Sequence, residues 1–100
     1  MKVKIGPLTY DLLLVPKLAS DEGIGLSGQI LYEEGVIKLE KESNPRRQLV
    51  VLWHEVMHGI SDLYGLELSE QTVSLLATAT FCAFEENPIL MNGELTTEEG

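Results

Sequence analysis

The sequence predicts an α+β fold, in which a small, mainly antiparallel sheet at the N-terminus is followed by helices. Residues 1–41 fall into short apolar or alternating runs separated by Gly- and Pro-containing segments, a pattern typical of strands. The residues after 44 instead place apolar side chains three and four positions apart, which is the period of a helix. Because the strands precede the helices, we expect the helices to pack on one face of the sheet.

Four strands are expected in the first part of the chain. Pro16 ends the second of them, and Ser20–Gly23 is expected to be a loop. The last two are separated by Glu33-Glu34-Gly35, a short turn that contains Gly, so we expect them to form a hairpin. The expected strand ranges are 2–5, 8–15, 26–32 and 36–40.

Two helices are expected in the second part of the chain. The first should run from about 45 to 64, because Asn44-Pro45 combines an N-cap with a proline at the first helical position. Gly65 suits the left-handed position that follows a helix end. Ser69 is expected to cap the second helix, which Asn87-Pro88 should end.

Length and composition set limits on the domain and its partners. We expect one domain at 1–91 and a disordered tail at 92–100. The formal net charge of −9 argues against binding to nucleic-acid phosphates, and no stretch reaches the roughly 20 apolar residues of a membrane span. The single cysteine, Cys82, excludes an intrachain disulfide, and no apolar signal region is expected at the start. We therefore expect a cytoplasmic protein that binds neither nucleic acid nor membrane.

The strongest functional signal is His54-Glu55-Val56-Met57-His58, which contains both histidines of the chain. Residues four apart lie on one face of a helix, so His54 and His58 can present two imidazoles to one divalent metal. Glu55 is turned by about 100° from His54 and can reach a water on that metal as general base. The alternative is that all three are ordinary polar residues at the edge of a core helix. A helix with so much apolar surface has little reason to carry them unless they line a cavity.

A catalytic zinc site takes three protein ligands and keeps one position for water, so a third ligand is needed. If the helix continues to Gly65, it moves about 10 Å away from His58. Residues 66–70 can span roughly 17 Å when extended, which is enough to return Glu70 to the metal. Glu70 is therefore the expected third ligand, although an acidic residue in the first turn of a helix is common for reasons of stability alone.

Two other acidic residues near the motif have a possible role in the metal site. Glu67 is closer to it in the sequence and is the alternative ligand, although a carboxylate in a loop is usually solvated. Asp62 is one turn beyond His58 and is too far along the helix to share the metal. Its expected role is to support the site by accepting a hydrogen bond from His58.

With these residues in place, the segment Arg47–Ile60 resembles the active-site helix of the zincin metallopeptidases. Together with the hairpin before it and the acidic residue that opens the next helix, residues 24–88 are similar to the small ImmA/IrrE-type metallopeptidases of phages and mobile elements. The spacing from the motif to the third ligand is short for that group, and the C-terminal region of its larger members is missing. The resemblance implies a minimal zincin-like fold and a Glu-zincin site, with Zn²⁺ bound by His54, His58 and Glu70 and with Glu55 as the base.

We therefore expect a zinc-dependent peptidase that acts on a protein or peptide. The resemblance implies a repressor as the substrate, since proteins of this group are associated with repressor cleavage. An extended substrate should lie beside an edge strand. The strand expected for this role consists of Val36, Ile37, Lys38, Leu39 and Glu40. The alternative is a non-catalytic zinc-binding interaction module of a phage or mobile-element regulatory system, because so small a chain has little surface for a specificity pocket.

Overall fold

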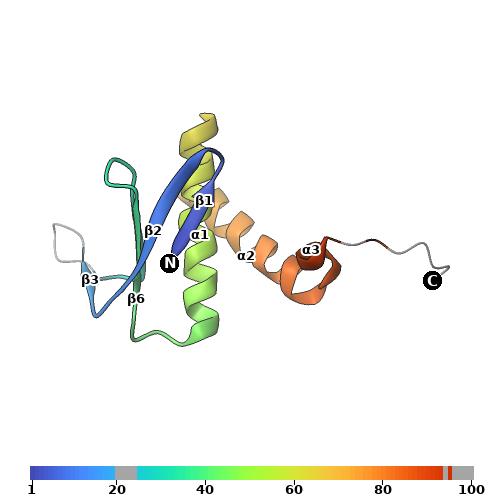
Figure 1. Cartoon of the computed structure of the whole chain (residues 1–100), viewed down its shortest axis with the longest axis horizontal. Helices are drawn as coiled ribbons and strands as arrows, with labels where there is room; N and C mark the ends of the chain where they lie inside the picture. Colours follow the sequence, from blue (N-terminus) through green and yellow to red (C-terminus); the bar gives the residue numbers. More distant parts are fainter. Residues whose placement is uncertain (20–24, 94, 96–100) are drawn as a thin grey trace.

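The fold is α+β: a four-stranded mixed sheet lies alongside a long helix, and a second helix leads away from it towards a third (Figure 1). This computed structural model describes residues 1–19, 25–93 and 95. The strands are β1 (Lys2–Ile5), β2 (Leu8–Val15), β3 (Leu18–Ala19), β4 (Gly25–Leu26), β5 (Gly28–Leu31) and β6 (Val36–Glu40). The helices are α1 (Pro45–Tyr64), α2 (Glu70–Glu86) and α3 (Ile89–Asn92).

The large sheet has the strand order β1-β2-β6-β5. β1–β2 and β5–β6 are antiparallel, as expected, but β2 and β6 are parallel, from Asp11 opposite Val36 to Val15 opposite Glu40. The sheet is therefore mixed rather than simply antiparallel. A parallel pair is connected by a long crossover instead of a tight turn, so no turn in the sequence marks this pairing.

The expectation that β6 is an edge strand is wrong. Val36, Ile37, Lys38, Leu39 and Glu40 form a central strand, with β2 on one side and β5 on the other. Because both sides of β6 are engaged in the sheet, its main chain has no free groups to offer an extended ligand. The two edge strands are β1 and β5, and α1 packs against β5.

The core lies between the sheet and α1. Ile5, Tyr10, Ile37 and Leu39 form its buried centre. Gly59 lets the helix approach closely, because a Cβ atom there would lie 2.6 Å from Ile5 Cδ1. The α1 side chains packed on this centre are Val51, Leu52, Val56, Ile60 and Leu63.

The helix ends follow the sequence signals. Asn44 Oδ1 accepts a hydrogen bond from the Arg47 main-chain N–H at 2.8 Å, and Gly65 has the left-handed φ of 63°. Ser69 Oγ accepts from the Thr72 N–H at 3.1 Å and so caps α2. α2 packs across α1, where the Trp53 and Phe84 rings stack with their centroids 5.2 Å apart.

The C-terminal region differs from the expectation at one point. α3 has no counterpart among the expected helices, and Asn92, the first residue of the expected tail, belongs to it. Glu94, residues 96–100 and the expected loop at 20–23 lie outside the described residues, so the disorder of the tail stays a prediction. None of the helices in the described part of the chain is long and apolar enough to cross a membrane.

The contact between β5 and α1 gives a prediction for stability. We expect Gly28→Ala to lower the free energy of unfolding by about 1–3 kcal/mol, because its Cβ would lie 2.4 Å from Val51 Cγ1. Adding Val51→Ala removes that atom, so the double variant should lose less than the sum of the two single losses, by about 1 kcal/mol or more. Urea unfolding of the four proteins measures this coupling. Additive losses would show that the contact does not limit the approach of the strand to the helix.

Candidate metal centre

The two histidines of α1 lie on one face of the helix, as their spacing predicts. Their Nε2 atoms are 3.1 Å apart. The side chains are partly exposed, at 22% for His54 and 26% for His58, so both rings remain open to a ligand on one side.

A short reversal of the chain after α1 brings the third acidic group back. Ser61 is buried near the end of α1, and its carbonyl oxygen accepts from the Leu66 N–H at 2.9 Å. Its Oγ accepts from the Leu68 N–H at 3.0 Å. These two bonds fix the connection to α1, and Ser69 then starts α2 with Glu70 in its first turn. The sequence did not point to Ser61, since a serine near a helix end is common.

Glu70 meets both histidines. Its Oε1 lies 2.7 Å from His54 Nε2, and its Oε2 lies 2.9 Å from His58 Nε2. One ligand atom from each of the three residues lies within 4.8 Å of the others, close enough to hold one metal ion. Ligand atoms around a tetrahedral zinc are separated by about 3.3 Å, so the group would have to open only slightly. The expected return of Glu70 is thus confirmed, and its role as a ligand stays a prediction.

The other two acidic residues lie outside this group. Asp62 and Glu67 are exposed and line a neighbouring cavity of about 300 Å³, which His58 and Tyr32 also border. No hydrogen bond joins Asp62 to His58 among the described residues, so a supporting role through that ring stays a prediction. The only group of three potential ligands within the described ranges contains neither acid.

α2 supplies a second contact with the histidines that the sequence analysis missed. Ser74 Oγ lies 3.4 Å from His54 Nδ1, the ring nitrogen that does not face Glu70. A partner on the second nitrogen fixes the orientation of a ligating imidazole. The signal was present in the sequence, because Ser74 follows Glu70 by four residues and therefore shares its helix face.

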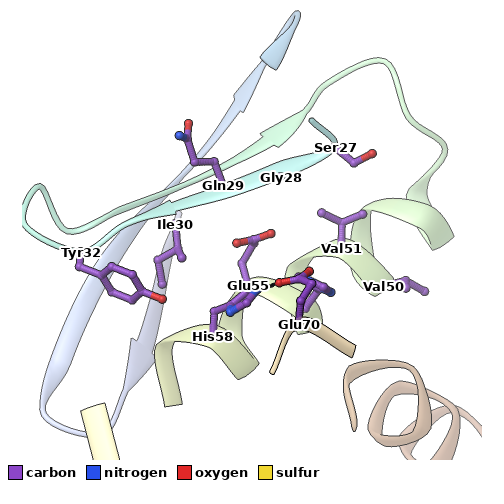
Figure 2. Close-up of a pocket in the computed structure, with 11 residues that line it drawn as sticks. Ser27, Gly28, Gln29, Ile30, Tyr32, Val50, Val51, Glu55, His58 and Glu70 are labelled. Atoms are coloured by element: carbon purple, nitrogen blue, oxygen red, sulfur yellow. Dashed lines mark hydrogen bonds and ion pairs between the residues drawn. The ribbon is translucent and has the colours of Figure 1, made fainter. Parts of the chain in front are cut away.

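Glu55 is the one buried carboxylate described near the histidines, with 7% of its surface exposed. Burial raises the pKa of its carboxyl to about 6; the nearby His54 opposes this shift, Glu70 adds to it, and a hydrogen bond from the Ile30 main-chain N–H opposes it. Figure 2 shows its side chain between β5 and the His58–Glu70 pair. Glu55 is therefore placed to exchange protons near neutral pH beside the potential metal ligands.

His54, Glu55, His58 and Glu70 all line one cleft of about 540 Å³ between α1 and β5. Figure 2 shows the Tyr32 ring, which follows β5, pointing into the same space. Gly28 and Tyr32, on the β5 side of the cleft, were not expected to belong to the site. Nothing local in the sequence identifies β5 as an edge strand. The cleft is lined by Ser27, Gly28, Gln29, Ile30, Tyr32, Val50, Val51, His54, Glu55, His58 and Glu70.

Comparison with known proteins adds no relative. No protein-family model matches the chain, and neither a curated protein nor a solved structure matches it. The interpretation of the site therefore rests on its own chemistry. That chemistry is two imidazoles and a carboxylate in contact, next to a buried carboxyl group with a raised pKa.

The raised pKa of Glu55 predicts a pH-dependent stability. A carboxyl whose pKa rises from 4.5 to about 6 on folding binds more protons in the folded chain, so stability falls as pH rises through that window. In chelator-treated protein, the stability of the wild type relative to Glu55→Gln should drop by about 2 kcal/mol between about pH 4 and pH 7. Urea unfolding at the two pH values measures the free energy of unfolding of both proteins. The other titrating groups are common to both, so their effects cancel in the difference. A difference that does not change with pH would contradict the shift.

The geometry also predicts how a metal binds. We expect one Zn²⁺ per chain, and Glu70→Ala should weaken its binding by at least about tenfold, because it removes a carboxylate whose two oxygens contact the two histidines. Glu67→Ala is the matched control, since it removes the same charge from the adjacent loop and should change the affinity little. Calorimetric titration ranks the two variants. Equal losses of zinc affinity in the two variants would show that the affinity depends only on the total negative charge near the site.

Proposed function

We propose that this protein is a zinc-dependent peptidase with a minimal zincin-like fold. The observation that carries the proposal is the position of the buried Glu55 carboxyl, which shares a cleft with the His54–His58–Glu70 group. Metal ligands alone would be consistent with a structural site. A general base beside them, at the wall where an extended chain could lie, favours hydrolysis.

The donor set suits zinc. Two imidazole nitrogens and one carboxylate oxygen are the ligands of many catalytic zinc sites, which keep a further position for water. Glu70 is 67% exposed, so the group has an open side towards solvent. At such a site zinc supplies a Lewis acid for the carbonyl oxygen and lowers the pKa of water.

Glu55 is the proposed general base. With a pKa of about 6, its carboxyl is mostly ionised at neutral pH and can take a proton from the attacking water. The same pKa is high enough for the protonated form to pass that proton to the amine that leaves. The Ile30 N–H holds the carboxylate on the β5 side of the cleft, where the reacting bond would lie.

The proposed substrate is a protein or peptide in an extended conformation along the open edge of β5. The Ile30 N–H points away from β6 and is already taken by Glu55, so a peptide beside β5 would use the remaining outward main-chain groups of this strand. Strand addition at such an edge uses main-chain hydrogen bonds, which suits a peptide ligand. A repressor protein in the cytoplasm is the substrate that the resemblance implies.

One observation favours the alternative, a non-catalytic zinc-binding interaction module. The hydrogen bond from the Ile30 N–H gives Glu55 a structural role, because it ties the edge strand to α1. A buried carboxylate with that role would be retained without any catalysis.

The two functions differ in the effect of Glu55→Gln. If the protein is a peptidase, the zinc-loaded wild type should cleave an unfolded or repressor-like protein, and a zinc chelator should stop the reaction. Glu55→Gln should lower the rate by at least about 100-fold while the zinc content stays at one per chain, because it removes the base and no ligand. Mass spectrometry of the products measures cleavage, and elemental analysis measures zinc.

A matched control is Glu86→Gln, which makes the same change of side chain and charge at the exposed end of α2, outside the cleft lining. Its activity should stay near that of the wild type. Cleavage that survives Glu55→Gln would contradict the assignment of the base. Zinc binding without cleavage of any peptide in a broad library would favour the interaction module.

A further inference from the structure

Two further hollows adjoin the cleft, one towards each end of α1. A cavity of about 320 Å³ bordered by Arg47 shares Val50 with the cleft. At the opposite end, the cavity bordered by Asp62 and Glu67 shares Tyr32 and His58 with it. The three hollows therefore follow one another along α1, from its first turn to its last.

The cleft and the two hollows beside it form a groove along α1, and the two ends of this groove carry opposite charges. Arg47 is exposed and donates through Nη2 to Ser27 Oγ at 2.8 Å, with no ion pair to an acidic residue in the described part of the chain. Asp62 and Glu67 are also exposed, and neither forms an ion pair with a lysine or arginine among the described residues. No Lys or Arg follows Arg47 in the whole sequence, so neither the last turn of α1 nor the segment after it carries a cation of its own.

This charge order is unfavourable for α1. A helix dipole favours acidic residues in the first turn and basic residues in the last turn, by about 0.3–1 kcal/mol each. α1 has no acidic residue in its first turn and no basic residue in its last. Arg46 is compensated, because it pairs with Glu85 at 2.8 Å and lies over the Phe81 ring. The charges of Arg47 and Asp62 are not compensated in this way. A charge that opposes the helix dipole is expected where a surface serves function.

We infer that the groove binds an extended peptide whose two ends carry opposite charges, with acidic side chains at the Arg47 end and basic side chains at the Asp62 and Glu67 end. The inference rests on the proposed function, because it names the class of substrate for the same site. Electrostatic complementarity of this kind sets the register and direction of a bound chain more than its affinity.

The length of α1 places the charges of the peptide. Arg47 precedes the midpoint of the two histidines by about 13 Å along the helix, and Asp62 follows it by about 9 Å. An extended peptide advances about 3.3 Å per residue. The acidic side chains should therefore lie about four residues from the reacting bond on one side, and the basic side chains about three residues from it on the other.

Binding of two peptides of reversed charge order tests this. Both are fluorescein-labelled, about ten residues long and of the same composition, with an apolar centre; one has lysines before the centre and glutamates after it, and the other has the reverse. Zinc-loaded Glu55→Gln protein should bind one order at least about fivefold more tightly by fluorescence anisotropy, and added salt should reduce the preference. The triple variant Arg47→Glu/Asp62→Lys/Glu67→Lys, made in the same background, should prefer the opposite order.

The matched control is Glu86→Lys, which changes the net charge by the same amount at the far end of α2 and should keep the original preference. The triple variant should melt at or above the temperature of its parent, because its charges suit the dipole of α1. Equal binding of the two peptides, no binding of either, or an unchanged preference in the triple variant would overturn the inference. A charge-order preference without any cleavage by the wild type would support the inference while the peptidase proposal fails.

Discussion

The close packing of α1 against the sheet is the constraint on which the rest of the structure depends. Two glycines permit it: a Cβ at Gly59 would meet Ile5, and one at Gly28 would meet Val51. At this short distance the helix completes the core on one side and brings Glu55 against the edge strand. A larger residue at either position would separate the two walls that form the cleft.

The burial of Glu55 follows from this packing, and it has a cost. An unpaired carboxylate away from water is strongly unfavourable, so it takes a hydrogen bond from the Ile30 N–H and holds its proton up to a higher pH than a free glutamate. The helix can therefore pack closely on the sheet and still present a titrating group. The same interaction uses one main-chain amide of the open sheet edge, which links the edge strand directly to the chemistry of the cleft.

The connection between α1 and α2 completes the site. Ser61 holds this connection through two hydrogen bonds, and α2 then returns across α1 with Glu70 and Ser74 on one face. Glu70 thereby meets the imidazole atoms that face the cleft, while Ser74 reaches the other nitrogen of His54. A loop of fixed length and two capped helix ends are thus enough to assemble three potential ligands from two elements.

The sequence by itself determined the features that depend on neighbouring residues. Periodicity and turns gave the ranges of β1, β2 and β6, the caps at Asn44 and Ser69 gave the helix starts, and helical spacing placed His54 and His58 on one face. Chain reach alone allowed Glu70 to return. Only the tertiary structure decided that β6 is central and that β5 is an edge strand, because the parallel pairing of β2 with β6 joins distant segments without a turn between them. It alone also placed Gly28 and Tyr32 across the cleft from the histidines, since that depends on which strand lies beside the helix.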